Sequence, residues 1–196
     1  MLKKEASKIV GGLSTPGKMP CYSINLPATE CKTGAKLAQV PGTTCHGCYA
    51  LKGRYRFKTT KRAMALRLGA LLRPDWVQAM TTLITGHKYF RWHDSGDLQG
   101  VQHLKKIFEV CNNTPGTMHW LPTQERQYLP MGSYPKNLVI RLSNAKNNTA
   151  PGQAWTHWST VVDHGGDCPA SKQGNQCGDC RRCWNPKVKH VTYPKH

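Results

Sequence analysis

Short apolar segments rich in β-branched and aromatic residues alternate along this chain with longer segments whose apolar residues recur every three or four positions. The first pattern predicts β-strands and the second predicts amphipathic helices. Strands are predicted within residues 21–28, 88–97, 116–126, 137–145 and 158–163. Helices are predicted over residues 58–72, 74–84 and 101–113, and residues 1–20 have the Gly, Ser, Pro and Lys content of a loop.

The helix predicted over residues 101–113 has one clearly apolar face. Val101, Leu104, Ile107 and Cys111 lie on it at helical spacing. A free cysteine in such a position behaves as a small apolar side chain. We therefore expect Cys111 to be a core residue and not a metal ligand.

Strands that alternate with helices favour an α/β fold with a parallel sheet. About five strands are too few for a closed eight-stranded barrel, so we expect a partial, open parallel β/α barrel. The barrel is assigned to residues 1–167, and residues 168–196 are assigned to a C-terminal cysteine-rich, cluster-binding appendage packed on it. Active sites of such folds form where the strands end. Polar residues follow the predicted strands at Glu30 to Cys48, His93 to Gln99, Thr123 to Arg126, and Ser143 to Asn144.

Nine cysteines are many for 196 residues. No secretory segment and no apolar run of membrane-spanning length is visible, so we expect no membrane association and a location in the cytoplasm. In a reducing compartment, cysteines in such numbers favour thiolate ligation of metal over disulfides.

The cysteines near the C-terminus, here the tail group, have the spacing C-x8-C-x2-C-x2-C. They are Cys168, Cys177, Cys180 and Cys183. Successive x2 spacings are typical of loops that wrap a [4Fe–4S] cluster, whereas zinc sites more often use two separate CxxC pairs. Four cysteines would close such a site, which would then be structural or would carry electrons. Zinc stays open as the alternative.

Cys31, Cys45 and Cys48, here the loop group, lie in the Gly- and Pro-containing segment 29–56. Three thiolates on a [4Fe–4S] cluster would leave one iron free to bind a small molecule. A fourth ligand, either Cys21 or His46, would instead close the site as a zinc site or a structural cluster. We favour three ligands, because Cys21 begins a predicted strand, and a residue placed like His46 is more often a supporting group.

The chain has 28 Lys and Arg against 10 Asp and Glu, a formal net charge of +18. No acidic residue lies between Cys31 and Pro74, although this segment contains ten basic residues. Such a field attracts nucleic acid or another polyanion, although a basic solvated surface has the same composition.

Five stretches spread over residues 20–196 resemble a known family of proteins. They read CHGCYALKGRY, FRWHDSGDLQ, WLPTQER, NLVIRLS and CGDCRRCW. They resemble phage-encoded iron–sulfur proteins of the "gene product eighty-eight" family, which are similar to small radical S-adenosylmethionine proteins. This resemblance implies a host-cell cytoplasmic location, one or two [4Fe–4S] clusters and S-adenosylmethionine as a further cofactor.

The same resemblance implies roles for particular residues. Radical enzymes place a glycine-rich acidic turn after the second strand to hold the cofactor's amino group, and Ser95-Gly96-Asp97 stands in that position. Tyr49, beside the last loop-group cysteine, and His93 are further candidates for cofactor binding. Here the first cysteine gap is thirteen residues and the aromatic residue follows Cys48, whereas radical enzymes have a short gap and an aromatic before that cysteine.

Two functions follow from these patterns, and no catalytic side chain is assigned. The first is a radical S-adenosylmethionine enzyme, supplied by an electron donor, that acts on a nucleic-acid-related substrate. The second is a non-catalytic iron–sulfur or zinc protein that binds nucleic acid or a host protein.

Overall fold

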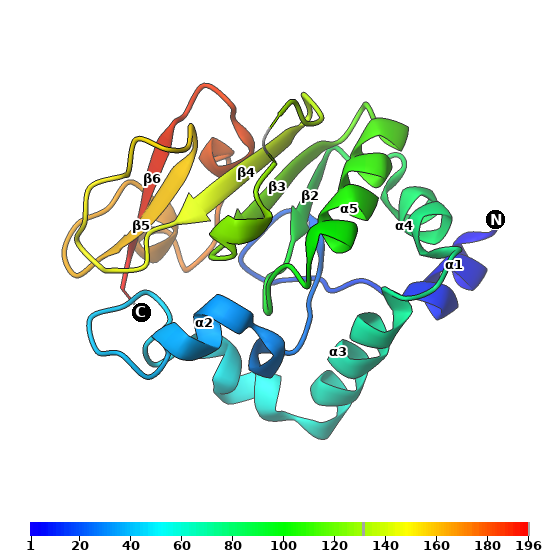
Figure 1. Ribbon diagram of the computed structural model, residues 1–196, viewed down its shortest axis with the longest axis horizontal. Helices are drawn as coiled ribbons and strands as arrows, with labels where there is room; N and C mark the ends of the chain where they lie inside the picture. The colour runs from blue at the N-terminus through cyan, green and yellow to red at the C-terminus, as the bar shows by residue number, and fades with distance from the viewer. Residues whose placement is uncertain (131, 196) are drawn as a thin grey trace.

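The computed structural model describes residues 1–130 and 132–195, and in this part of the chain six parallel strands form one sheet in the order β1-β2-β3-β4-β5-β6 (Figure 1). The strands are β1 (Tyr22–Ile24), β2 (Tyr89–Trp92), β3 (Met118–Thr123), β4 (Leu138–Ser143), β5 (Trp158–Val162) and β6 (His190–Pro194). The α-helices are α1 (Lys3–Val10), α2 (Lys32–Leu37), α3 (Lys58–Ala70), α4 (Trp76–Ile84) and α5 (Val101–Asn113). The predicted parallel α/β sheet is confirmed, and the sheet is open, with β1 and β6 at its edges.

Short 3₁₀ helices occupy the connections. They are η1 (Ala28–Glu30), η2 (Tyr49–Leu51), η3 (Gly53–Arg56), η4 (Arg126–Tyr128), η5 (Pro169–Lys172) and η6 (Arg182–Trp184). Among the described residues no helix is long and apolar enough to cross a membrane.

Three elements besides the 3₁₀ helices were not expected from the sequence, and one of them is α2, which forms within segment 29–56 where no helix was predicted. Residues 1–20 were expected to be a loop, and this is wrong, because α1 forms there and buries Ala6 and Val10 against the main core. Gly11 ends α1 in the left-handed conformation, with φ of 78°, as glycines at helix ends commonly do. The cysteine-rich C-terminal segment also supplies β6, which pairs along its whole length with β5.

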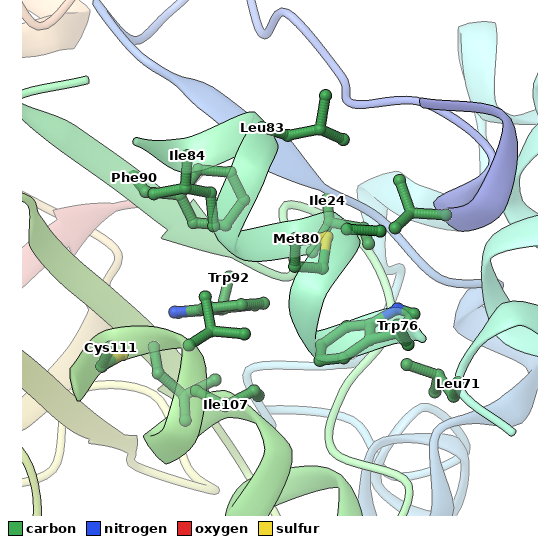
Figure 2. Packing of buried hydrophobic residues seen from close by; sticks show 14 of the residues in the cluster. Ile24, Leu71, Trp76, Met80, Leu83, Ile84, Phe90, Trp92, Ile107 and Cys111 are labelled. Carbon is green, nitrogen blue, oxygen red and sulfur yellow. The ribbon is translucent and has the colours of Figure 1, made fainter. Parts of the chain in front are cut away.

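One face of the sheet, here the helix face, packs against α1, α4 and α5. Figure 2 shows Phe90 and Trp92 of β2 beside Met80 of α4 and Ile107 of α5, all buried. Burial of such large side chains is the main stabilising contribution to the sheet. Cys111 is completely buried in this cluster, so its prediction as a core residue is confirmed.

The opposite face, here the tail face, carries charged and aromatic side chains. Arg91 and Trp120 are in register on β2 and β3, and Arg141 of β4 lies on the same face. The tail covers this face: the ring of Trp184 lies 5.5 Å from that of Tyr89 and 5.2 Å from that of Trp120. The sheet is therefore enclosed by helices on one side and by the cysteine-rich tail on the other.

Candidate metal-binding site

The segment that contains the loop group lies across the carboxyl ends of several strands. The hydroxyl of Thr44 donates a 2.6 Å hydrogen bond to the Asn144 carbonyl after β4. The hydroxyl of Tyr49 donates to the Asp94 carbonyl after β2, and that of Tyr55 donates to the Asp94 carboxylate at 3.0 Å. The loop group is thus held at the end of the sheet where parallel α/β folds place their active sites.

Glu125, which follows β3, holds the first cysteine of the loop group in place. Its carboxylate accepts hydrogen bonds from the backbone N–H of Lys32 at 3.0 Å and of Thr33 at 2.8 Å, and from the Thr33 hydroxyl at 2.8 Å. These are orphan donors at the start of α2, directly after Cys31. Glu125 is completely buried, so this charge-assisted cap is sheltered from water. Glu125 was expected among the polar residues at a strand end, but its role as a cap of α2 was not predicted.

Two thiols of the loop group, those of Cys31 and Cys45, lie beside Gly34. A Cβ added to Gly34 would lie 3.5 Å from Cys45 Sγ and 3.7 Å from Cys31 Sγ. Burial raises the pKa of Cys31, and the negative charges of Asp97, Cys45 and Cys48 raise it further. Burial likewise raises the pKa of Cys45 to about 12, with Cys48 and Asp97 adding to the effect. A raised pKa opposes loss of the thiol proton, so a metal bound here would have to supply the positive charge that stabilises the thiolates.

Cys21 lies with the tail group and not with the loop group. Burial raises the pKa of its thiol to about 12, an effect that the positive charge of Arg91 opposes and that Cys177 reinforces. The other residue considered as a fourth ligand, His46, is exposed, and its Nδ1 lies 3.2 Å from the Ala38 carbonyl oxygen. Neither of these contacts places Cys21 or His46 with the thiols of Cys31 and Cys45, and the three-cysteine ligand set stays a prediction.

The turn Ser95-Gly96-Asp97 packs tightly against the end of β1. The hydroxyl of Ser95 donates to the Leu26 carbonyl at 3.0 Å, and the Leu26 N–H donates to the Ser95 carbonyl at 2.9 Å. Gly96 has φ of 76°, and a Cβ there would lie 2.6 Å from Leu26 Cβ. Only glycine fits this position without displacing the backbone of its neighbour.

Asp97 lies beside the loop group and joins the ends of β2 and β3. Its carboxylate accepts hydrogen bonds from Leu98 N–H at 2.7 Å, the Thr123 hydroxyl at 2.6 Å and Gln124 N–H at 2.8 Å. Burial raises the pKa of Asp97 to about 7, and these three donors oppose that rise. A carboxylate has about four acceptor positions, so one remains for a further donor.

His93, predicted to bind a cofactor, packs against α5. It is 3% exposed, has φ of 54°, and its ring centroid lies 5.2 Å from that of His103. Burial, with the positive charge of His103, lowers its pKa well below the usual value. Among the described residues neither ring nitrogen has a hydrogen-bond partner. By contrast Tyr49, the other predicted residue, is anchored beside the loop group by its hydroxyl.

The tail group lies toward the tail face of the sheet. The Cys177 N–H donates to the Lys18 carbonyl at 2.8 Å, and the Cys168 N–H donates to the Thr192 carbonyl at 3.0 Å. Burial raises the pKa of Cys177, and Cys168 and Cys180 raise it further. Cys183 Sγ lies 3.2 Å from the Tyr193 hydroxyl.

The described part of the chain contains no three His, Cys, Asp or Glu side chains close enough together to hold a single metal ion. A [4Fe–4S] cubane presents one iron at each corner and therefore takes thiolates that are spread more widely than those of a tetrahedral ion.

Comparison with known proteins gives one match. The family model described as "Gene product 88" matches residues 1–164, which include β1 to β5 and the whole loop group. No curated protein and no solved structure matches the chain. The match covers most of the chain, and the protein therefore belongs to the Gene product 88 family.

Proposed function

We propose that this protein is a phage-type iron–sulfur enzyme of the radical S-adenosylmethionine kind, with its catalytic cluster in the loop group. The observation that carries the proposal is that Cys31, Cys45 and Cys48 gather without a fourth cysteine, since Cys21 lies beside Cys177. A three-cysteine set on a [4Fe–4S] cluster leaves one iron for a small molecule. In the proposal, the open sheet is the wall of a partial β/α barrel whose mouth contains this site.

The residues present suit such a cluster. Gly34 leaves open the space that a side chain would take between Cys31 and Cys45, because its own Cβ would lie 3.1 Å from Cys31 Cβ. Buried thiols with raised pKa gain most from a positively charged partner. The chemistry that a bound cluster supplies is one-electron reduction of S-adenosylmethionine, whose cleavage yields a radical that removes a hydrogen atom from substrate.

The chain's own residues have binding and positioning roles in this proposal. Glu125 fixes the start of α2 and so orients Cys31, and Tyr49 fixes the segment after Cys48. Asp97, close to Cys31 and Cys45, keeps one acceptor position with which to receive an ammonium group. Thr123 and Glu125 are both buried, and they hold Asp97 and the start of α2 in place by hydrogen bonds.

The proposed substrate is nucleic acid or a nucleotide. The formal charge of +18 supports a polyanionic partner, and the ten basic residues between Cys31 and Pro74 are in the same segment as the loop group. An external electron donor would be required in addition.

The test is anaerobic purification followed by reconstitution with iron and sulfide. Iron and sulfide analysis with electron paramagnetic resonance should detect a reducible [4Fe–4S] centre whose signal changes when S-adenosylmethionine is added. Slow release of 5′-deoxyadenosine should follow in the presence of a reductant. A colourless protein with stoichiometric zinc, or a cluster signal indifferent to S-adenosylmethionine, contradicts the proposal.

A second candidate is a non-catalytic metalloprotein that binds nucleic acid. It is favoured by the hydrogen bonds that already occupy most of the Asp97 carboxylate and by the strong positive charge. Binding to labelled DNA or RNA that weakens steeply with salt, without any release of 5′-deoxyadenosine, would favour it over the enzyme.

A further inference from the structure

Arg141 is a buried positive charge on the tail face. It is completely buried, and it donates to three carbonyls of the tail: Cys183 at 3.0 Å, Arg182 at 2.8 Å and Asn185 at 3.2 Å. Its Nη1 has no hydrogen-bond partner among the described residues. Carbonyls satisfy part of the guanidinium but supply no counter-charge.

Arg91 is a second cation on the same face. Its guanidinium lies 4.5 Å from the centre of the Trp120 ring, and its buried Nε has no hydrogen-bond partner in the described part of the chain. Its side chain also hydrogen-bonds with that of Tyr49. Two further contacts are weak: Met19 Sδ lies 3.4 Å from Nη1, and the His93 carbonyl lies 3.5 Å from Nη2.

Arg141 is the less well compensated of these two cations, because burial lowers its pKa. Burial also lowers the pKa of Arg91, but Tyr49 and Asp94 raise it by more. Within residues 1–130 and 132–195, neither guanidinium forms an ion pair with a carboxylate. The negative charge of the Asp94 carboxylate raises the pKa of both Arg91 and Arg67, so it is shared between two cations. This carboxylate also accepts hydrogen bonds from Ser23 and Asn25. A buried charge without a partner is costly, so an anion is expected here.

The anion can come from the tail group, because Arg141 donates to the carbonyl of Cys183 itself, and Arg91 lies over the Trp120 ring, which packs against Trp184 directly after Cys183. The Cys183 thiol lies 3.2 Å from the Tyr193 hydroxyl. Burial raises the pKa of this thiol, and the positive charges of Arg141 and Arg91 oppose that rise. Burial likewise raises the pKa of Cys21, and the positive charge of Arg91 opposes that rise, which Cys177 reinforces. Four thiolates around Zn²⁺, or around a [4Fe–4S]²⁺ core, carry a net charge of about −2.

We propose that the tail group holds a dianionic four-thiolate metal centre, and that Arg141, which is buried, and Arg91, which is half-buried, are its counter-ions. The arginines are positioning residues that do not ligate the metal. Their charges stabilise the loaded state, and the centre in turn stabilises the packing of the tail against the sheet. This inference concerns the tail group alone and goes beyond the function proposed for the loop group.

The test removes each charge in a protein that lacks the loop centre. In a Cys45→Ser background, Arg91→Gln and Arg141→Gln are compared with Arg91→Lys, Arg141→Lys and the exposed Arg182→Gln. Each protein is titrated with Zn²⁺ against a chromophoric chelator, and in parallel it is reconstituted with Fe²⁺ and sulfide. The two arms identify which metal the four thiolates take.

The two glutamine variants should bind metal about tenfold more weakly, because a counter-charge is lost in a poorly solvated place. The lysine variants should keep most of the affinity, and Arg182→Gln should bind as the background does. Metal loading should also raise the melting temperature less in the glutamine variants. An equal loss of metal affinity in the lysine and glutamine variants would show that the arginines only hold the tail in place through hydrogen bonds and packing, which overturns the proposal. Unchanged affinity in Arg91→Gln, which breaks few hydrogen bonds, overturns it as well.

Discussion

The two cysteine groups differ most in the charges around them. The loop group lies beside two buried acids, Asp97 and Glu125, whose charges act on Cys31 and Cys45. The tail group lies beside the buried Arg141 and the half-buried Arg91, whose positive charges oppose the rise in pKa that burial causes at Cys183 and, for Arg91, at Cys21. Similar ligands in opposite electrostatic surroundings are suited to different work, since surrounding charge tunes a metal centre as strongly as its ligands do.

The groups also differ in how they are held. The loop group depends on hydrogen bonds between its own segment and strand ends far away in sequence. Glu125 accepts from the Thr33 N–H, and Thr44 donates to the Asn144 carbonyl. The tail group depends on backbone pairing of β6 and on the carbonyls that Arg141 holds. Damage to the strand ends should therefore affect the first group and spare the second.

The largest expected effect follows from Cys45→Ala. The variant should lose the loop centre, about four iron atoms per chain, because two cysteines do not retain a cubane. Its tail centre should persist, since the tail group lies on another face of the sheet. Iron and sulfide analysis against Cys180→Ala, which removes a tail ligand, gives the matched comparison. Unchanged iron content in Cys45→Ala would show that the ligands of the loop group are wrongly assigned.

A second large effect is expected at the strand end that supports the loop group. Gly96→Ala should reduce the free energy of unfolding by about 3 kcal/mol, from left-handed strain together with a Cβ that meets Leu26 at 2.6 Å. Gly116→Ala is the control, since nothing lies within 4 Å of its added Cβ. Urea unfolding measures both. A loss in Gly96→Ala no larger than that in the control would mean that the turn adapts.

Acid should act on both groups together, because it destabilises the sheet that they share. His119 is completely buried on the helix face of β3, and its Nε2 lies 2.9 Å from the Thr114 hydroxyl. Burial lowers the pKa of His119 to about 3. Between about pH 6.5 and pH 3 the unfolded chain therefore binds a proton at this residue that the folded chain does not bind. Its contribution to stability is therefore complete above about pH 6.5 and is lost as the pH falls, by about 3 kcal/mol at pH 4.

The measurement is the free energy of unfolding between pH 7 and pH 4 for the wild type, His119→Gln and His164→Gln. His119→Gln should flatten the decline, whereas His164 is exposed and its replacement should leave the curve as it is. His93 and His103, whose pKa values burial also lowers, should keep part of the slope in every variant. Parallel curves for His119→Gln and the wild type would contradict the assignment.

The difference in charge predicts an order of reduction potentials if both groups hold iron–sulfur clusters. Acids beside the loop group disfavour an added electron, and arginines beside the tail group favour one, so the loop centre should have the lower midpoint potential, by on the order of 100 mV. Redox titrations of Cys180→Ala and Cys45→Ala, followed by electron paramagnetic resonance, isolate one centre each. The reverse order would mean that solvent exposure outweighs these charges.

Much of the fold follows from local patterns in the sequence. The helix over residues 101–113 and the strands within residues 88–97, 116–126, 137–145 and 158–163 form where they were predicted, because their apolar periodicity matches the faces that the fold buries. The strand β6 was missed, since its sequence HVTYP ends in proline and is flanked by lysines. The helix α1 was missed because only two of its eight residues are fully buried.

The composition of the candidate site was less predictable. Spacing identifies Cys45 and Cys48 as a pair, but it does not show that Cys21 lies beside Cys177, which is 156 positions away. The cap that Glu125 gives to Thr33 joins residues 92 positions apart, and the charges of Arg91 and Arg141 meet the tail only after folding. Such relations depend on tertiary structure, which local patterns do not encode.

The smallest effect on the loop group is expected from Cys21→Ser, and it bears most directly on the number of its ligands. The serine keeps nearly the same volume but removes the thiol, and Cys21 interacts with Cys177 and Arg91, not with Cys31 or Cys45. The electron paramagnetic resonance signal of the loop centre, recorded with and without S-adenosylmethionine, should stay as in the wild type. Any change should fall on the tail centre. If Cys21→Ser instead removes the loop signal as Cys45→Ala does, Cys21 is its fourth ligand, the site is closed, and the metal there stabilises the fold without reacting with substrate.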